Sequence, residues 1–169
     1  MIRIGQGFDM HRFEKGKALM LGGVHIPHEW GLQGHSDGDA LLHAICDALL
    51  GALSLGDLGK FFSDTDARHK NRSSMEFVDE VYGKIQAQGY VLGNLDSTIL
   101  TEKPKLAPYI EEMKSKIAQA LSVDVDQISI KATRPESMGA LGRDEGLAAM
   151  ASVILLKKIP AQPSDAMLC

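Results

Sequence analysis

The segment DGDALLHAICDALLGAL, at residues 37–53, places the strongest constraint on how this chain can fold. Leucines, alanines and one isoleucine recur at helical spacing and cover most of the circumference of the helix they would form. Such a helix has to be covered by other parts of the domain. The sequence therefore predicts a buried helix that begins at Asp37 or Asp39 and ends near Gly51 or Gly56.

The composition suits one globular domain. The chain has 169 residues, of which 44% are hydrophobic and 24% charged, so it can bury a core of its own. Its net charge of -4 is spread over interspersed charges of both signs, which argues against nucleic-acid binding. The longest apolar run, at residues 146–156, is too short to cross a bilayer, and the first residues lack a signal-peptide pattern. We expect a cytoplasmic protein that binds neither membranes nor nucleic acids.

The cysteines Cys46 and Cys169 lie far apart in the chain, so their spacing indicates neither a disulfide framework nor a metal site. Because the protein is acidic overall, an anionic substrate would have to be held by metal ions or by local backbone donors.

Strand and helix patterns alternate along the chain, and no repeat or linker interrupts them before residue 158. In chain order the patterns predict a half-buried strand at 1–11, a hairpin at 17–27 turning at Gly22 and Gly23, helices at 37–53 and 73–89, a strand at 90–101, a helix at 106–121, and strands at 127–133 and 146–158. This order is typical of an α+β fold, a mixed β-sheet with helices packed on one face, close to the split βαβ (ferredoxin-like) pattern. We expect one domain over residues 1–157 and a flexible tail at 158–169.

Three local details follow from the same patterns. Ser73 and Glu76 have the spacing of a capping box at the start of a helix. Ile128, Ile130 and Ala132 should face inward from their strand. The strand at 146–158 is small and apolar on both faces, which predicts that protein covers both of its sides.

Asp9, His11 and His43 are the candidates for a metal centre. Asp9 and His11 stand two apart in a strand, so their side chains leave the same face. His43 lies inside the buried helix, where a polar side chain needs a partner. Two imidazoles and a carboxylate are a common zinc set that leaves a fourth position open for a reactant.

Asp47 would lie one turn after His43, on a polar stripe that also contains Asp39. In the metal interpretation, Asp47 holds the other nitrogen of the His43 imidazole. The alternative keeps Asp9 and His11 as a polar pair at a strand end and His43 as a core histidine bonded to Asp47. The spacing alone leaves both open.

Two further segments carry polar residues near glycines. His35 and Ser36 precede a helix, where backbone N–H groups favour an anion, although a plain capping loop explains them as well. Asp57, Asp64 and Asp66 could contact sugar hydroxyls or could simply form turns.

The loops at 101–108 and 131–146 both leave the ends of strands. They carry residue types that bind phosphates and metals, namely Lys103, Lys105, Thr133, Arg134, Glu136 and Arg143. Each could be a solvated loop residue, but together they predict a site.

In their order along the chain, several blocks resemble the 2-C-methyl-D-erythritol 2,4-cyclodiphosphate synthases of the non-mevalonate isoprenoid pathway. The blocks are RIGQGFDMHRF, LGGVHIP, GLQGHSDGDALLHAICDALLGAL, LGDLGKFFSDTD, LGNLDSTIL, PKLAPYI, ISIKAT and GALGRDEGLAA. They keep their order and spacing over residues 2–157. The resemblance implies a phosphorus–oxygen lyase that works as a homotrimer, with its active sites between neighbouring subunits.

The implied reaction starts from 4-diphosphocytidyl-2-C-methyl-D-erythritol 2-phosphate. Its 2-phosphate attacks the β-phosphorus, which closes the cyclic diphosphate and releases CMP. A phosphate is already ionised at neutral pH, so this reaction needs no general base. The difficulty is to bring two anionic groups together, which metal ions and positioning can achieve.

The resemblance also implies a role for individual residues. It implies that Asp9, His11 and His43 bind Zn²⁺, and that Glu136 binds Mg²⁺ or Mn²⁺ together with the substrate diphosphate. It assigns the catalytic contacts with the phosphates to His35 and Arg134. The implied substrate contacts are Asp9, His11, His35, Ser36, Asp57, Gly59, Phe62, Asp64, Asp66, Thr101, Lys105, Leu106, Ala107, Ala132, Thr133, Arg134, Glu136, Ala140 and Arg143.

The chain departs from the pattern of this family at three places. Gln6 replaces a frequent histidine, and Arg134-Pro135 replaces the usual pair of threonines, so one hydroxyl expected on the diphosphate is absent. Ala140-Leu141 replaces an aromatic residue and a hydroxyl beside the trimer axis, where the family can hold an isoprenoid diphosphate in a central cavity. The alternative function is therefore a non-catalytic trimer that binds metal or isoprenoid phosphates on the same scaffold.

Overall fold

The computed structural model describes residues 1–63, 66–69 and 72–158. Its main sheet has five strands in the order β4-β1-β7-β5-β6. These are β1 (Ile2–Lys15), β4 (Trp30–Leu32), β5 (Tyr90–Leu100), β6 (Ile128–Thr133) and β7 (Gly146–Lys157). Only β5 and β6 pair in parallel, so the sheet is mixed as expected. A second, two-stranded sheet is the hairpin of β2 (Leu19–Leu21) and β3 (Val24–Ile26), which turns at Gly22 and Gly23 as predicted.

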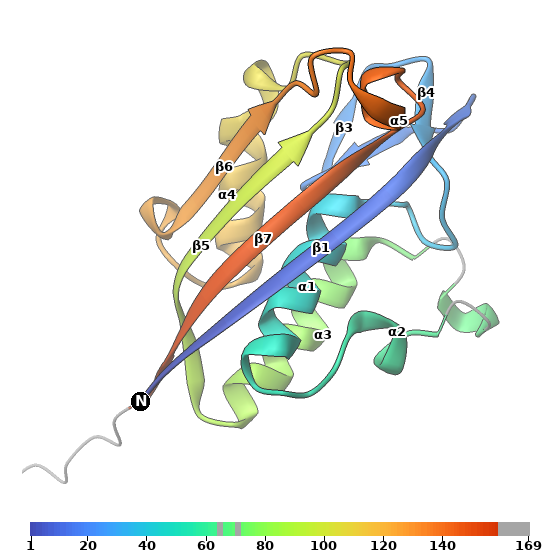
Figure 1. Ribbon diagram of the computed structural model, residues 1–169. Helices are drawn as coiled ribbons and strands as arrows, with labels where there is room; N and C mark the ends of the chain where they lie inside the picture. Colours follow the sequence, from blue (N-terminus) through green and yellow to red (C-terminus); the bar gives the residue numbers. More distant parts are fainter. Residues whose placement is uncertain (64–65, 70–71, 159–169) are drawn as a thin grey trace, which may run out of the picture.

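The three long helices lie on one side of the main sheet (Figure 1). They are α1 (Ala40–Ala52), α3 (Ser74–Ala87) and α4 (Ile110–Ala120). The short helices are α2 (Leu58–Phe61), α5 (Gly139–Gly142) and the 3-10 turns η1 (Ala67–His69), η2 (Ala107–Tyr109) and η3 (Val125–Gln127). The expected α+β architecture is confirmed, whereas β4, α2 and α5 were not predicted because they are too short to show a period.

Helix α1 is the buried helix that the sequence predicts. Asp39 caps it by accepting from the backbone N–H of Leu42, and the apolar residues around the helix are fully buried. The helix packs on β1, β7 and α3. It forms the centre of the core that the sheet and the other helices enclose.

Helix α1 approaches β1 so closely that no side chain fits between them. A Cβ atom added at Gly5 would lie 1.9 Å from the carbonyl oxygen of Ala48, and one added at Gly7 would lie 1.9 Å from that of Ala44. Glycine in the strand facing alanine in the helix lets the two backbones meet. Because side chains alternate along a strand, Asp9 and His11 share this face with the two glycines.

Most of the larger apolar residues of β1 consequently point away from the helices, whereas Phe13 is buried. The half-buried strand that the sequence predicts is present, but Ile2, Ile4, Phe8 and Met10 lie on its exposed side. The alternation of apolar and polar residues predicts the strand, but the contact with α1 decides that the side with the glycines is buried.

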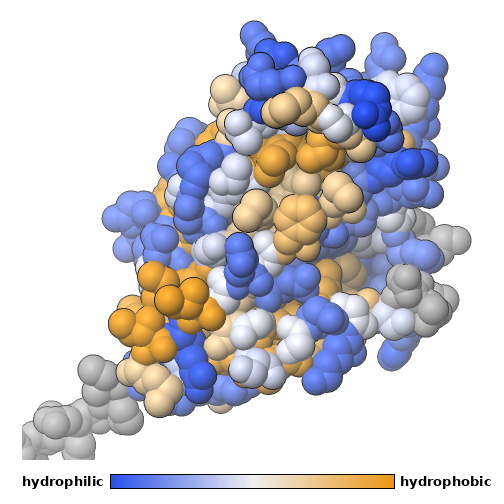
Figure 2. Space-filling view, in the orientation of Figure 1, coloured by the Kyte–Doolittle hydropathy of each residue, from blue (hydrophilic) through white to orange (hydrophobic). Residues whose placement is uncertain are grey.

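The expectation that protein covers both sides of β7 is wrong for most of its length within this chain. Residues Gly146–Ala149 are buried, but from Met150 onward every second residue is exposed. Met150, Ile154 and Leu156 lie opposite Phe8, Ile4 and Ile2 in the strand register, so all share one face. Figure 2 shows hydrophobic side chains on this open face of the sheet, near the start of the chain and again higher up.

Two smaller expectations also need correction. Ser73 caps α3 by accepting from the N–H of Met75, but the capping box with Glu76 is not formed, because Glu76 pairs with Arg72 at 2.8 Å. In β6, Ile128 and Ile130 are buried as expected, whereas Ala132 is exposed where the edge strand runs past α4.

Cys46 is a buried free thiol, and Cys169 lies outside the described residues. The expected flexible tail also falls outside them, except for Lys158. Within the described ranges, none of the helices combines the length and hydrophobicity needed to cross a membrane.

Gly7→Ala should lower the free energy of unfolding although it adds only one methyl group. The added methyl group would overlap the Ala44 carbonyl, and such overpacking costs at least about 1–3 kcal/mol. Gly83→Ala is the matched control, because Gly83 is exposed in α3 with nothing near its added Cβ, and alanine there should stabilise by about 0.5–1 kcal/mol. Urea unfolding of both variants measures the difference, and equal stability would contradict the close approach of α1 and β1.

Candidate active site and metal centre

Asp9, His11 and His43 converge on one point between β1 and α1. The Oδ2 atom of Asp9 lies 2.8 Å from Nε2 of His11 and 2.9 Å from Nδ1 of His43. The two ring nitrogens are 3.2 Å apart. The triad therefore presents one oxygen and two nitrogens to a common centre, as the sequence predicts.

The surroundings of the triad leave these three atoms available as ligands. Nδ1 of His11 donates to the carbonyl of Gln33 at 2.5 Å, so Nε2 is the nitrogen that faces Asp9 and can bind a metal when it loses its proton. The other carboxylate oxygen of Asp9 accepts from the N–H of Met10 at 2.9 Å, which turns Oδ2 toward the histidines. A backbone group thus orients each of the two strand residues.

The charges in the site favour a cation. Burial alone would raise the pKa of Asp9, but hydrogen bonds and charge interactions with His11 and His43 hold it well below its usual range. Burial alone would lower the pKa of His11, but its bond to Asp9 raises it above the usual value. Both shifts show that Asp9 stays ionised and attracts positive charge to this point.

The triad fits a divalent metal ion. A tetrahedral ion with bonds of about 2.0–2.2 Å separates its ligand atoms by about 3.3–3.6 Å. The observed separations of 2.8–3.2 Å need only a small outward movement of the side chains to reach that range. All three ligands are half-buried, so one side of the ion would remain open to a reactant.

Asp47 does not hold His43, so both interpretations that used this contact are wrong on this point. The Asp47 carboxylate accepts from the N–H of Leu58 at 2.7 Å and fixes the start of α2. Nε2 of His43 instead lies 2.9 Å from the hydroxyl of Ser74 and 3.2 Å from that of Ser36. The sequence period placed Asp47 one turn away, but the imidazole turns toward the start of α3.

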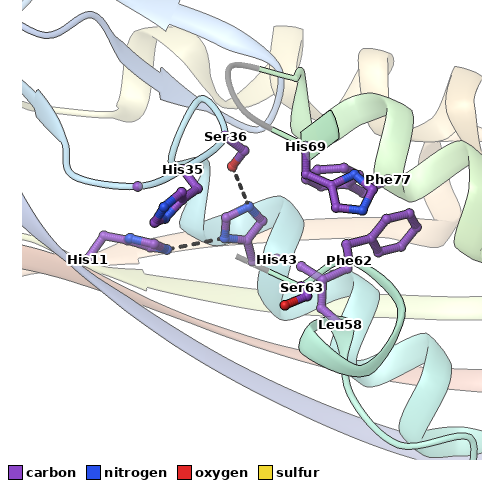
Figure 3. Close-up of a pocket in the computed structure, with 10 residues that line it drawn as sticks. His11, His35, Ser36, His43, Leu58, Phe62, Ser63, His69 and Phe77 are labelled. Carbon is purple, nitrogen blue, oxygen red and sulfur yellow. Dashed lines mark hydrogen bonds between the residues drawn. The ribbon is translucent and has the colours of Figure 1, made fainter. Parts of the chain in front are cut away.

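A pocket beside the triad has a polar end and an aromatic end (Figure 3). The polar end contains His11, His35, Ser36 and His43, all drawn around one opening in the figure. Phe62, His69 and Phe77 form the aromatic end, joined to the polar end by Leu58 and Ser63. The rings of Phe62 and Phe77 are 4.6 Å apart between centroids.

His35 and Ser36 reach this pocket, as the metal and anion interpretation requires. Ser36 also accepts from the N–H of Gly38 at 3.3 Å, so the alternative of a capping loop is partly correct. The start of α1 is not free to bind an anion, because the Asp39 carboxylate occupies it.

The aspartates that follow α1 have local partners. Asp57 caps α2 by accepting from the N–H of Lys60 at 2.9 Å, with Gly59 in the same turn. Asp66 pairs with Arg68 at 2.6 Å, which lowers its pKa to about 2. Asp64 lies outside the described residues. Asp57 and Asp66 have the turn-forming contacts of the simpler interpretation, and their contacts with a sugar remain a prediction.

A second cleft forms where β5 and β6 end. It is lined by Thr101, Glu102, Pro104, Lys105, Leu106, Ala107, Ala132, Thr133 and Arg134. The implied substrate contacts Thr101, Lys105, Leu106, Ala107, Ala132, Thr133 and Arg134 are therefore in one place. The parallel pairing of β5 with β6 explains this, because both strands end at the same edge.

Arg134 is tied to the wall of this cleft. Its Nη2 atom donates to Glu102 at 2.5 Å and its Nε at 3.1 Å, while the other Glu102 oxygen accepts from the N–H of Ser137 at 3.2 Å. The pair lowers the pKa of Glu102. Glu102, which the sequence reasoning did not single out, thus clamps the loop at 134–137.

Glu136, Ala140 and Arg143 lie apart from both clefts. Glu136 is exposed in a left-handed conformation with φ of 52°, and Arg143 is exposed and pairs with Glu145 at 2.7 Å. Ala140 lines a separate pocket with Met10, Arg12 and the triad residue His11. Within one chain Glu136 and Arg143 line neither this pocket nor the two clefts.

The sequence reasoning missed Ser74, which contacts His43, and three residues that line the first pocket, namely Leu58, His69 and Phe77. Phe77 was recognised only as part of the apolar face of α3. Each reaches the pocket through the packing of α2, η1 or α3 against α1, and no spacing in the sequence signals that contact.

Comparison with known proteins is consistent with this geometry. A sequence profile of the YgbB family matches residues 2–156. The chain belongs to the YgbB family. One member, named 2-C-methyl-D-erythritol 2,4-cyclodiphosphate synthase in Shouchella clausii, is 55% identical over 158 residues, covering 94% of this chain and 99% of that protein.

Solved structures in the YgbB family share the fold. The bifunctional IspDF from Campylobacter jejuni superposes with a TM-score of 0.89 at 43% identity, covering 92% of this chain and 42% of that longer chain. IspF from Plasmodium falciparum, solved as a CDP complex, gives a TM-score of 0.82 at 32% identity, covering 94% of this chain and 97% of that chain.

His43→Ala should remove the tightly bound metal without unfolding the protein. Mutation of a residue that only hydrogen-bonds a metal ligand weakens metal binding by about 10–100-fold. Loss of one of the three ligands should weaken it more. His28→Ala is the control, since His28 hydrogen-bonds Trp30, packs on the Phe13 ring and is not one of the three ligands. Elemental analysis of the purified proteins measures metal per chain, and an unchanged content in His43→Ala would contradict the assignment of the triad.

Proposed function

We propose that this chain makes 2-C-methyl-D-erythritol 2,4-cyclodiphosphate from 4-diphosphocytidyl-2-C-methyl-D-erythritol 2-phosphate in the cytoplasm, with release of CMP. The observation that carries the proposal is the convergence of Asp9, His11 and His43 beside a pocket that has a polar end. Relatives named for this product, at 50–55% identity over most of the chain, support it.

The two ends of the pocket match the two parts of the substrate. His35 and Ser36 lie beside the triad, where they can donate hydrogen bonds to phosphate oxygens. Phe62 and Phe77 offer an apolar surface to the methyl-bearing carbon chain. The substrate would lie with its phosphates at the triad and its carbon chain toward the aromatic rings.

Positioning and charge carry out the reaction in this proposal. The 2-phosphate attacks the β-phosphorus, a new P–O bond closes the ring, and the bond to the α-phosphate breaks so that CMP takes the electron pair. Zn²⁺ held by the triad, with Mg²⁺ or Mn²⁺ at Glu136, would neutralise the phosphates that have to approach one another. His35 and Arg134 orient the phosphates from the protein side.

The second cleft is the proposed cytidine site. Thr101, Lys105 and Leu106 line it together with backbone from residues 132–134, which suits a flat base held by main-chain groups. The CDP complex of the Plasmodium falciparum relative supports a nucleotide ligand. In one chain this cleft shares no lining residue with the first pocket, so the two clefts do not form one site.

A homotrimer with active sites between subunits resolves this separation. The open face of the sheet carries the exposed apolar residues expected of a subunit contact, among them Ile4 at 73% and Phe8 at 57% exposure. Glu136 and Arg143 are exposed, and we propose that they bind the second metal and, in a central cavity of the trimer, an isoprenoid diphosphate.

The alternative is a non-catalytic trimer that binds metal or isoprenoid phosphate. One observation favours it, because Glu102 already accepts from Nε and Nη2 of Arg134 and would compete with a diphosphate for this guanidinium. The presence of His35, Glu136 and the whole triad favours the enzyme.

Release of CMP distinguishes the two functions. The metal-loaded protein, incubated with the cytidyl substrate and Mg²⁺, should produce CMP and the cyclic diphosphate in equal amounts, measured by chromatography. Absence of CMP from a protein that contains its metal would support the binding function instead.

Phe8→Arg should convert the trimer to monomers, because the trimer would then bury a charged side chain in the apolar contact between subunits. Removing that charge from water is unfavourable. Val125→Arg is the control, since Val125 is an exposed apolar residue at η3, away from this face. Light scattering after size-exclusion chromatography measures the mass. A trimer that survives Phe8→Arg would argue against the open face as the contact.

A further inference from the structure

Behind His43, on the side away from Asp9 and His11, lies a small buried polar network. The hydroxyl of Ser74, at the first residue of α3, is 2.9 Å from Nε2 of His43. Ser74 is fully buried, with 0% of its surface exposed. The carboxylate of Asp37, from the loop before α1, bonds both the hydroxyl of Ser74 and its backbone N–H, the latter at 2.9 Å.

The donors and acceptors of this network fix its direction. An ionised carboxylate can only accept, so the hydroxyl proton of Ser74 points to Asp37. The Ser74 oxygen then has lone pairs left for His43 and can only accept from Nε2. The chain therefore runs from the N–H of His43 to the Ser74 oxygen, and from the Ser74 proton to Asp37.

This direction determines which nitrogen of His43 can bind a metal. With Nε2 donating to Ser74, Nδ1 is the nitrogen that faces the Asp9 oxygen at 2.9 Å, and its lone pair is available to a metal when it loses the proton that it shares with Asp9. His11 is fixed in the same sense by the Gln33 carbonyl. The Gln33 carbonyl fixes the tautomer of His11, and Ser74 together with Asp37 fixes the tautomer of His43.

We propose that Ser74, held by Asp37, is a positioning residue that fixes the ring orientation and the tautomer of His43 for metal binding. The inference rests on the metal centre proposed above. Partners of this kind orient the ligands of many protein metal sites, although the acceptor is usually a carboxylate or carbonyl in direct contact. Here the Ser74 hydroxyl lies between the His43 imidazole and the Asp37 carboxylate, so the carboxylate acts on the imidazole through the hydroxyl.

The structure separates this role from helix capping. Ser73, not Ser74, is the N-cap of α3, and its side chain accepts from the N–H of Met75 at 3.3 Å. Asp37 is held in turn through its own N–H, which donates to the carbonyl of Arg72 at 3.1 Å. The loop and the helix start thus present the Ser74 hydroxyl to His43 as one unit.

Ser74→Ala tests the proposal, with Ser73→Ala as the matched control. Affinity for Zn²⁺ is measured by competition with a chromophoric chelator, and the Co²⁺-substituted proteins give a visible spectrum that reports ligand geometry. We expect Ser74→Ala to bind Zn²⁺ about 10–100-fold more weakly with an altered Co²⁺ spectrum. Ser73→Ala should lower the melting temperature through its lost cap but leave affinity and spectrum unchanged.

Asp37→Asn provides a second variant if Ser74→Ala does not fold. The amide can donate to the Ser74 oxygen, which would turn the hydroxyl proton toward His43 and favour the wrong tautomer. Asp37→Asn should therefore weaken Zn²⁺ binding, as Ser74→Ala does. Ser74→Thr keeps the hydroxyl and should bind Zn²⁺ more tightly than Ser74→Ala.

The outcomes separate this inference from the function. Unchanged Zn²⁺ affinity and Co²⁺ spectra in Ser74→Ala and Asp37→Asn would overturn the positioning role while leaving the metal centre and CMP release intact. A wild-type protein that binds no Zn²⁺ would overturn both the metal centre and the positioning role.

Discussion

The direct contact between the backbones of α1 and β1 is the constraint on which the rest of the structure depends. Gly5 and Gly7 leave no room for a side chain beneath Ala44 and Ala48, so the helix lies against the strand. That contact places His43 above the residues that follow the glycines on the same face, Asp9 and His11. The metal centre is therefore a consequence of how closely a helix can approach a strand, because a larger spacing would separate its ligands.

The polar stripe on α1 extends this principle to the neighbouring elements. A buried helix has to satisfy each polar side chain it carries, and two aspartates and one histidine do so with different neighbouring elements. Asp39 holds the turn between β2 and β3 through Gly22 and Gly23, and Asp47 holds the start of α2. His43 turns its outer nitrogen to Ser74. The elements that surround the pocket are thus fixed to the helix that supplies a ligand.

The open face of the sheet explains why a single chain holds two separate clefts. The glycines turn the larger apolar side chains of β1 away from α1, and β7 adds its own on the same side. An apolar face of this kind needs a partner surface, and the proposed trimer supplies it. The same contact would bring the cleft of one subunit toward the metal centre of the next, so the glycines would support both the ligand geometry and the assembly.

The sequence by itself determined the buried helix, the order of the main elements, the shared face of Asp9 and His11, and the stripe that contains His43. Periodicity gives these because it records which side chains share one face of one element. Only the tertiary structure decided that the glycine side of β1 faces inward, that Ser74 and not Asp47 holds His43, and that Glu102 restrains Arg134. Those contacts join elements distant in the chain, and the side chain that reaches a partner depends on how closely the elements pack, which no spacing within one element records.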